Sequence, residues 1–476
     1  WLEASATEYF VTPGSNLPLN LSALNRSDFP LKLEKVAFSV NGSDTTLSVP
    51  LPDNKIFSVS TSLKIPEKEN FSIPYWLRGD QYYDNLKSTH PEMIGLAENP
   101  PALTVKFYLQ SQDQTLEYDV PVTYKWTDPV EGEQYRQVLI TPPATVHFTE
   151  LVYVFPDKNS KELKVQVKDL TGPLSGIISL NLPENWKVSP VRQPFELKEK
   201  GNQINVLFTV TPPENLNEST VSANLTIGDI SYNYDMDEIN YRHIPVQTML
   251  QKAQAKLVRA DLATAEKHIG YIMGPGDDIP PLLTQAGYQV SLLNESDITA
   301  ENLSSFDAVV TGIRAYNTDD WLKYKQNTLL NYVYQGGTLL MQYNVTRNLV
   351  MDNLGPYSFD ISHDRVTVED APVTFLLPDH PVLNYPEKIT EADFSGWVQE
   401  RGLYFADKWD PKYETPLACN DPGEEPKPGG LLIAKYGNGT FIYTGYAFFR
   451  QLPAGVPGAF RLFVNLISAG DNHAAK

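Results

Sequence analysis

The spacing of apolar residues changes near residue 245 of this 476-residue chain. Before that point, short runs alternate apolar and polar side chains, as Leu163, Val165 and Val167 do. Such alternation is typical of half-buried antiparallel strands, and the clusters of Pro, Asn, Asp and Gly between the runs favour turns. Beyond that point, short apolar runs alternate with segments of helical spacing, which is typical of parallel α/β sheets. The chain therefore predicts all-β domains followed by an α/β domain.

The length suggests about three domains, at roughly 150 residues each. We expect a β-sandwich over residues 1–129, a second β-sandwich over residues 130–245, and a doubly wound, flavodoxin-like α/β domain over residues 246–476. The segment 179–189 resembles immunoglobulin-like modules attached to bacterial carbohydrate-active enzymes, so we expect the second sandwich to be immunoglobulin-like. A polar helix rich in Ala, Lys and Gln is expected over Gln251–Glu266 as the connector.

Strand and helix signals alternate along the α/β part. Asp278 and Asp319 stand where helices are expected to begin. Parallel strands are expected over residues 269–273, 289–293, 306–311 and 338–343. A hairpin over residues 431–444 and a helix over residues 457–467 close the chain, and the series predicts an open sheet with helices on both faces.

The charge balance is strongly acidic, since 38 Lys and Arg residues against 58 Asp and Glu residues give a net charge of −20. Because no block of Lys or Arg offsets this charge, we expect no nucleic-acid partner. No run approaches the roughly 18 apolar residues of a membrane span, so we expect no transmembrane segment. The chain starts at Trp1 without an initiator Met or a signal segment, so we expect its natural N-terminus to have been removed.

The sequence holds one cysteine, Cys419, which excludes intrachain disulfides and thiolate metal clusters. The seven histidines are scattered without metal-ligand spacing. The turn at residues 274–276 lacks the Gly-x-Gly-x-x-Gly pattern of dinucleotide sites, and Asp277 and Asp278 stand where a helix N-terminus already favours acids. We therefore expect no metal site and no cofactor.

Ligands of open parallel sheets bind beyond the carboxyl ends of the strands. The segments that follow the predicted strands carry planar hydrogen-bond donors and rings, which suit a carboxylate, a phosphate or a sugar. The candidate ligand-binding residues of this crevice are Arg314, Tyr316, Asn317, Gln342, Asn344, Arg347, Gln399, Glu400, Arg401, Arg450 and Gln451. For residues 397–404 and 450–457, an internal Arg–Glu network that clamps a long loop to the sheet is an open alternative.

Four aromatic residues lie close together in the first domain, at Tyr75, Trp76, Tyr82 and Tyr83. Rings of this kind stack on sugars in many lectin-like sites, and they also cover the edges of hydrophobic cores. Both interpretations stay open at the level of the sequence.

The series of strands and helices over about residues 251–470 resembles class I glutamine amidotransferase-like domains, including the trehalose-utilisation (ThuA-like) branch. In that fold a nucleophile sits on a tight turn after a central strand. The matching turn contains Gln342, Tyr343 and Asn344, none of which is Cys or Ser. The partner His expected after the late strand is missing from residues 443–451. The resemblance therefore implies the fold without a catalytic residue.

Distinctive runs along the whole chain lie at residues 1–4, 25–27, 380–384, 393–405 and 449–462. Together they resemble the C-terminal region of large PIG-L/LmbE-like deacetylases of Bacteroidetes-type bacteria. In that family an N-terminal zinc domain with the motif Ala-His-Pro-Asp-Asp-Glu removes acetyl groups from N-acetylglucosamine-type sugars. The motif occurs nowhere in this sequence.

This resemblance implies an accessory region at a periplasmic or extracellular location, partnered by the N-terminal deacetylase domain of the same parent chain and by a glycan. We expect a non-catalytic role, either in glycan binding or in domain scaffolding. One alternative is a sugar-modifying or hydrolytic enzyme whose crevice uses Glu369, Asp370, Glu400 or Asp407. The other alternative is a purely structural spacer at the cell envelope.

Overall fold

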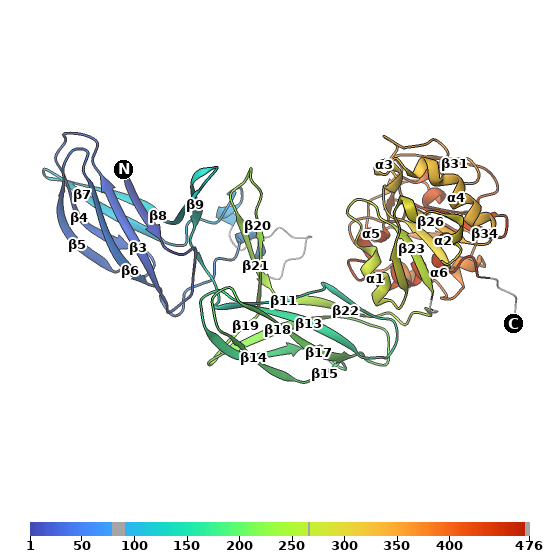
Figure 1. Ribbon diagram of the computed structural model, residues 1–476, viewed down its shortest axis with the longest axis horizontal. Helices are drawn as coiled ribbons and strands as arrows, with labels where there is room; N and C mark the ends of the chain where they lie inside the picture. Colours follow the sequence, from blue (N-terminus) through green and yellow to red (C-terminus); the bar gives the residue numbers. More distant parts are fainter. Residues whose placement is uncertain (79–90, 265–266, 472–476) are drawn as a thin grey trace.

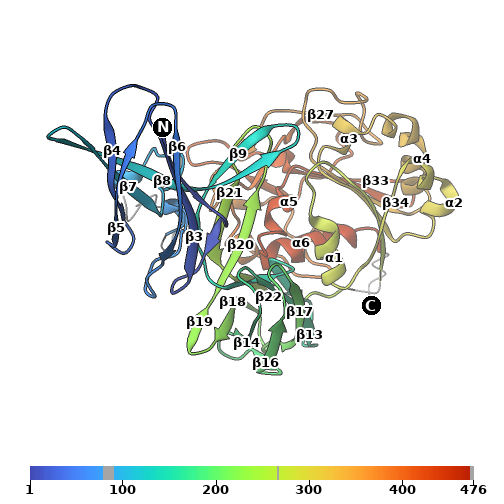
Figure 2. The same ribbon diagram turned by 60° about the vertical axis from the view of Figure 1, so that its left-hand side comes forward.

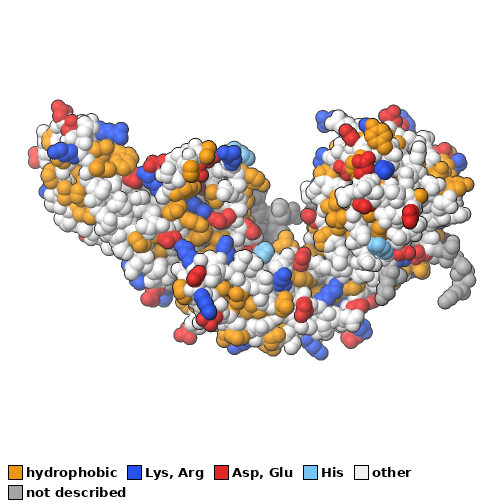
Figure 3. All heavy atoms as spheres, viewed as in Figure 1, with side chains coloured by type: hydrophobic (Ala, Val, Ile, Leu, Met, Phe, Trp, Pro, Cys, Tyr) orange, Lys and Arg blue, Asp and Glu red, His pale blue; other side chains and the backbone are white. Residues whose placement is uncertain are grey.

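The computed structural model describes residues 1–78, 91–264 and 267–471, which form three parts arranged as a U (Figure 1). The first sandwich and the α/β domain are the two arms, and the second sandwich joins them at the base. Figure 3 shows one face of the molecule, hollowed between the arms, with basic side chains scattered among acidic ones. Tyr82, Tyr83 and the helix expected near residues 80–87 lie outside the described residues. In the described part, no helix is long and apolar enough to cross a membrane.

The first sandwich is built around the long strand β8 (Gln114–Asp128). One half of β8 pairs with β7, and the other half pairs with β9 and, in parallel, with β1. Leu19, Leu33 and Phe107 lie on strands at either side of β8 and meet in one buried core. The other elements are β1 (Leu2–Ala6), β2 (Phe10–Val11), β3 (Asn16–Leu24), β4 (Leu31–Phe38), β5 (Asp44–Leu51), β6 (Ile56–Lys64), η1 (Tyr75–Leu77), η2 (Pro91–Met93), β7 (Thr104–Ser111), β9 (Gly132–Gln137) and β10 (Leu139–Ile140).

The second sandwich packs two sheets, β11–β13–β17–β15 and β12–β22–β18–β14–β16, against each other, with β19 beside β18. The alternation predicted for Leu163, Val165 and Val167 is confirmed, because all three are fully buried on β13. The strands are β11 (Ala144–Phe148), β12 (Val152–Phe155), β13 (Lys161–Asp169), β14 (Leu174–Asn181), β15 (Lys187–Ser189), β16 (Arg192–Leu197), β17 (Gln203–Thr211), β18 (Asn217–Ile227), β19 (Ile230–Tyr232) and β22 (Gln254–Arg259).

The helix expected over Gln251–Glu266 is wrong for the described residues. Instead, β21 (Gln247–Lys252) forms a hairpin with β20 (Tyr234–Ile239), and β22 pairs with β18 and β12 of the second sandwich. Ala255 and Leu257 of β22 are buried in the core of that sandwich, so the pairing of neighbouring strands outweighs the helix propensity of the segment. Both ribbon views place the hairpin β20–β21 beside β9 of the first sandwich (Figures 1 and 2).

The α/β domain contains the expected open sheet, in the order β24–β23–β25–β26–β34–β33. All neighbours pair in parallel except β33, which is antiparallel to β34 at one edge. The strands are β23 (His268–Ile272), β24 (Gln289–Leu292), β25 (Ala308–Thr311), β26 (Thr338–Gln342), β33 (Leu431–Tyr436) and β34 (Gly439–Thr444).

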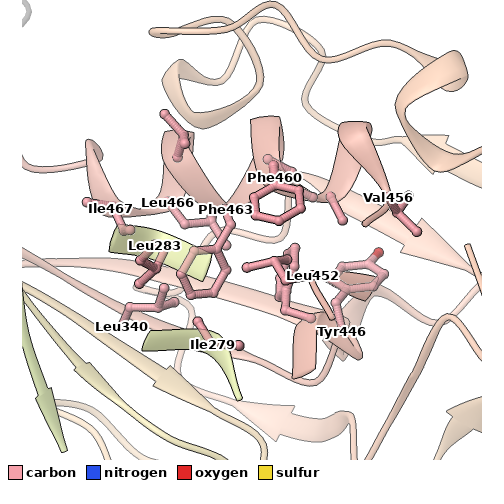
Figure 4. Close-up of a cluster of buried hydrophobic side chains, with 14 of the residues drawn as sticks. Ile279, Leu283, Leu340, Tyr446, Leu452, Val456, Phe460, Phe463, Leu466 and Ile467 are labelled. Atoms are coloured by element: carbon pink, nitrogen blue, oxygen red, sulfur yellow. The ribbon is translucent and has the colours of Figure 1, made fainter. Parts of the chain in front are cut away.

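Helices cover both faces of this sheet, which confirms the doubly wound prediction. α1 and α6 pack on one face, where Leu283, Leu340 and Phe463 point toward one another (Figure 4). α2 and α4 pack on the other face around Leu329 and Leu339. The helices are α1 (Ile279–Gln285), η3 (Glu295–Asp297), α2 (Ala300–Leu303), α3 (Ala315–Thr318), α4 (Leu322–Tyr334), α5 (Phe448–Gln451) and α6 (Pro457–Ile467).

A long excursion between β26 and β33 covers part of this domain with short paired strands. Its pairs are β27 with β31, β28 with β30 and β29 with β32. The elements are β27 (Phe359–Ile361), β28 (Arg365–Val366), β29 (Val373–Phe375), η4 (Pro381–Leu383), η5 (Glu391–Phe394), β30 (Gly402–Leu403), β31 (Ala406–Trp409), β32 (Leu417–Cys419) and η6 (Pro428–Gly430).

Candidate functional site

Three neighbouring parallel strands end at one edge of the α/β sheet, and each is followed by a large polar or aromatic side chain. Arg314 follows β25, Tyr343 directly follows β26, and Phe449 and Arg450 lie on α5 just after β34. Because β25, β26 and β34 are adjacent and parallel, their carboxyl ends meet at this edge. This carboxyl edge is therefore the candidate site.

Three rings, Tyr343, Tyr404 and Phe449, form what we call the aromatic surface of the carboxyl edge. The rings of Tyr343 and Tyr404 stack 5.9 Å apart at 5° between their planes, and Phe449 lies 5.1 Å from Tyr343. The ring of the exposed His363 lies 5.7 Å from that of Tyr404. Tyr343 is buried, whereas Tyr404 and Phe449 are half-buried. The outer two rings therefore cover Tyr343 and keep part of their own surface in solvent.

A network of two arginines and one buried carboxylate lies next to the aromatic surface. Arg450 donates from Nε to Glu400 Oε1 at 2.8 Å and from one terminal nitrogen to Gln399 Oε1 at 2.7 Å. Arg365 donates to Glu400 Oε2 at 2.6 Å. The guanidinium of Arg450 also stacks 4.6 Å from the centre of the Phe449 ring. Since the Glu400 side chain is only 1% exposed, its charge is compensated by these two guanidiniums.

The electrostatics of Tyr343 reflect the positive charge at this edge. Burial raises the pKa of the Tyr343 phenol, and the nearby Arg314 and Arg450 oppose that rise by favouring the phenolate. Arg314 is exposed, so its guanidinium stays available to a ligand in solvent. The edge thus presents ring faces together with cationic hydrogen-bond donors.

The backbone of the carboxyl edge is strained at several non-glycine residues. Positive φ values occur at Arg314 (57°), Asn348 (58°), Gln399 (69°) and Tyr404 (54°). Non-glycine residues rarely adopt this left-handed backbone conformation, and those held in it cluster at binding and active sites. Arg314 stands between β25 and α3, which is the strand-to-helix position of a strained elbow. Arg314 therefore carries a left-handed backbone one strand away from the turn at residues 342–344, which the resemblance matched to the nucleophile position.

Three of the predicted ligand-binding residues are fully enclosed by protein. The hydroxyl of Tyr316 donates to Gln326, and the amide of Gln342 donates to the hydroxyl of Tyr271 at 2.8 Å. Asn344 accepts from the backbone N–H of Tyr316 at 3.0 Å. Each of the three is at most 1% exposed, so their polar groups hold the strand ends in place.

Asn317 and Arg347 lie on the neighbouring loops of the same edge. Asn317 donates to the carbonyls of Val345 and Arg347, both at 2.9 Å, and accepts from the N–H of Val345. It therefore fixes the loop after β26, while the Arg347 side chain is exposed.

Arg401 and Gln451 are buried beneath the edge and bind backbone. Arg401 donates to the carbonyl of Ala371 at 3.0 Å and 2.8 Å, and to that of Phe394. Gln451 accepts from the N–H of Val398 at 2.8 Å and donates to the carbonyl of the same residue at 2.9 Å. Gln451 thus ties the long excursion to α5, whereas these bonds of Arg401 lie within the excursion; the Arg–Glu pairs of the internal-network alternative are those of Glu400 with Arg365 and Arg450.

The carboxylates considered for an enzyme lie in different surroundings. Glu369 and Asp370 line a surface hollow of about 770 Å³ beside Arg401. Glu400 lies in the arginine network described above, and Asp407 lines a separate hollow. Among the described residues, these acids thus do not converge on one cavity.

The single thiol of the chain lacks the exposure and the low pKa of a nucleophilic cysteine. Cys419 on β32 is fully buried, and burial raises its pKa to about 12. A thiol with such a pKa stays protonated near neutral pH and is a poor nucleophile. Among the described residues, no group of three or more His, Cys, Asp or Glu side chains could hold a metal ion.

Sequence reasoning did not select Tyr343, Tyr404, Phe449, His363 or Arg365 as ligand-binding residues. In the structure Tyr404 stacks on Tyr343, whereas Trp397 contacts the rings of Tyr446 and Phe448. A usable signal was present for two of them, since an aromatic side chain stands within five residues of two strand ends, at Tyr343 and Phe449.

No protein-family model and no curated protein matches the chain. Solved structures similar to parts of it include Escherichia coli α2-macroglobulin in its native conformation, with 10% identity, a TM-score of 0.20 and coverage of 54% of this chain and 17% of that one. Red sea bream transglutaminase shows 11% identity and a TM-score of 0.24 over 53% of this chain and 31% of that one.

The exo-β-1,4-mannosidase Op5Man5 from Opitutaceae bacterium strain TAV5 shows 13% identity and a TM-score of 0.23, over 44% of this chain and 36% of the mannosidase. The chain thus spans well under two thirds of each of these proteins. They are distant likenesses to multidomain β-sandwich proteins and assign no family. By its own topology, the chain is a multidomain protein with β-sandwiches followed by a mixed, mainly parallel α/β sheet.

Proposed function

We propose that this chain is a non-catalytic accessory region of a sugar N-deacetylase and that it binds glycan at the carboxyl edge of its α/β sheet. The observation that carries the glycan-binding part is the aromatic surface, whose half-buried Tyr404 and Phe449 lie beside exposed or half-buried guanidiniums. Apolar faces of sugar rings pack on aromatic rings, and their hydroxyls accept hydrogen bonds from planar donors such as Arg314 and Arg450.

The link to a deacetylase is supported by the resemblance of five sequence runs, two of which build this edge. Residues 393–405 supply Gln399, Glu400 and Tyr404, and residues 449–462 begin with Phe449 and Arg450. The enzyme alternative is less well supported, because Glu400 is held by two arginines and the only thiol is buried.

A panel of sugars tests the binding site. N-acetylglucosamine, glucosamine, chitooligosaccharides and trehalose are added to the full chain in thermal-shift and calorimetric titrations. A ligand at one hundred times its Kd stabilises the folded state by about 2.7 kcal/mol, which shifts the Tm measurably. Tyr404→Ala is expected to weaken binding about tenfold, because the outer stacking face is lost.

Two variants keep this test specific. Tyr404→Phe retains the ring and is expected to bind as the wild type does. Tyr334→Ala removes a tyrosine that is 52% exposed at the last residue of α4, where the chain approaches the start of β26 at the opposite end of the sheet, and is expected to leave binding unchanged. If Tyr404→Ala binds as tightly as the wild type, or if no sugar in the panel binds, the carboxyl edge is not a glycan site.

A further inference from the structure

A second hollow of about 220 Å³ lies where the first sandwich meets the hairpin β20–β21. We call it the junction pocket. Its walls come from the segment around Trp76, from Glu98 and Asn99 before β7, from the strands β8, β9 and β10, and from the start of β21 with the residues before it. Cavities between domains are preferred places for small ligands. None of its lining residues belongs to the α/β domain, so the pocket is independent of the carboxyl edge.

The walls of the junction pocket are fixed by hydrogen bonds that cross between its parts. Glu98 accepts the side-chain amide of Gln137 on β9 at 3.0 Å and that of Gln247 on β21 at 2.8 Å. Arg136 on β9 reaches the hairpin at Glu238 (2.5 Å) and Thr248 (2.7 Å). A pocket held in this way is formed before a ligand arrives, so binding spends little free energy on ordering it.

The chemistry of the lining favours a neutral ligand with both an apolar face and hydroxyl groups. Trp76 is 41% exposed, and Pro74 and Val246 add apolar surface. Arg136 pairs with Glu238, and the carboxylate of Glu98 accepts two neutral side-chain amides, so both charged groups of the lining already hold hydrogen-bond partners. The lining as a whole holds one acidic and one basic side chain, so it carries no net charge that would favour an ion.

Hydrogen-bonding capacity remains for such a ligand. Within the described residues, the hydroxyl of Thr123 and the side-chain carbonyl oxygens of Gln137 and Gln247 have no side-chain hydrogen-bond partner. Planar amides and a hydroxyl beside an exposed indole are the groups that recognise a sugar ring. The volume is smaller than the roughly 300–1,000 Å³ of pockets for drug-sized ligands, which limits the occupant to about one ring.

We propose that the junction pocket binds one sugar ring of a neutral glycan against Trp76. Of the two interpretations that the sequence left open for this aromatic segment, Trp76 fits the sugar-stacking one, because 41% of it remains exposed rather than covering a core. The molecule then has two separate glycan sites, one on each arm of the U.

Saturation-transfer NMR and calorimetry on the full chain test this site. The probes are the monosaccharides glucose, galactose, mannose and N-acetylglucosamine and their β-linked disaccharides. Trp76→Ala is expected to lower the affinity for the bound sugar about tenfold. Trp1→Ala is the matched control, because Trp1 is also exposed (49%) on the first sandwich and lies outside the pocket. It is expected to bind as the wild type does.

A second variant guards against indirect effects on folding. Thr123→Val keeps the shape of the side chain and removes one hydroxyl, so a sugar contact predicts a threefold to tenfold loss with an unchanged melting curve. Tyr404→Ala separates the two sites, since it weakens binding at the carboxyl edge and leaves the junction pocket intact. Unchanged binding in Trp76→Ala, a complete loss of binding in Tyr404→Ala, or no saturable binding of any probe overturns the proposal.

Discussion

The two junctions of the U are held by different chemistry. At the junction of the second sandwich with the α/β domain, Val152 and Val258 lie in the same buried cluster as the core of that domain. At the junction of the first sandwich with the hairpin β20–β21, the contacts are mainly polar: the Arg136–Glu238 ion pair and the amide hydrogen bonds to Glu98 lie beside a ring contact, between Phe71 and Tyr234 at 5.1 Å. Apolar burial is non-directional and insensitive to salt, whereas ion pairs depend on geometry and are screened.

The difference indicates which arm is free to move. A shared apolar core couples the folding of the base to that of the α/β arm. A polar contact fixes an orientation at small cost in free energy, and it opens without exposing a core. We therefore expect the first sandwich to loosen from the hairpin before the α/β arm separates from the base.

The largest effect is expected from a charge placed in the apolar junction. Val258→Asp buries an unpaired carboxylate at a fully buried position and is expected to cost about 4 kcal/mol. Hydrogen exchange of β12 and β22 measures the loss as faster opening. Val191→Asp, at a position that is 66% exposed on the same sandwich, is expected to cost less than about 0.5 kcal/mol. Equal costs for the two variants would contradict the shared core.

A smaller effect is expected at the polar junction. Arg136→Ala removes a side chain that is 11% exposed and leaves Glu238 without its partner, at a cost of about 2 kcal/mol. The variant is expected to show faster hydrogen exchange and faster proteolysis in the hairpin β20–β21 alone. Arg242→Ala is the control, because Arg242 is 83% exposed in its pair with Glu131 and is worth at most about 0.5 kcal/mol. Loss of protection in the α/β arm as well would remove the contrast between the junctions.

A third effect is a pH dependence at the apolar junction. Lys161 donates to the carbonyls of Val154 and Gln285 there, and burial lowers its pKa to about 8. An unfolded lysine keeps its proton up to about pH 10.5, so between pH 8 and pH 10.5 the unfolded state binds more protons. The free energy of unfolding therefore rises with pH across this window.

Thermal melting of the wild type and of Lys161→Met between pH 7 and pH 10.5 measures this dependence. The wild type is expected to gain stability relative to the variant as the pH rises. A constant difference between the two would mean that Lys161 keeps an ordinary pKa at the junction.

The strands and helices with strong local patterns were predictable from the sequence. Leu163, Val165 and Val167 alternate with polar residues, and the helix over Pro457–Ile467 has its expected bounds. The strands within the segment 251–266 were not predictable, because its Ala, Lys and Gln content favours a helix in isolation. Its assignment depends on β18, which lies more than 25 residues earlier in the chain and pairs with β22.

The site was predictable only as a location. The rule for parallel sheets selected the edge that holds the candidate site, yet residue types alone do not distinguish Arg314, which is exposed, from Arg401, which is buried against backbone carbonyls. Tyr404 reaches the edge through a long excursion of short strands and a left-handed backbone turn, and no periodicity in the sequence signals that geometry.

The burial of Cys419 allows thiol labelling to measure how often the α/β domain opens. A thiol reagent added to the native protein meets no reactive thiolate, because the only thiol of the 476 residues is enclosed on β32 and its pKa is raised. Labelling then proceeds only through opening of the α/β domain, so its rate counts those openings without an introduced probe. The labelling rate of Cys419 in each junction variant then measures how often the α/β arm opens.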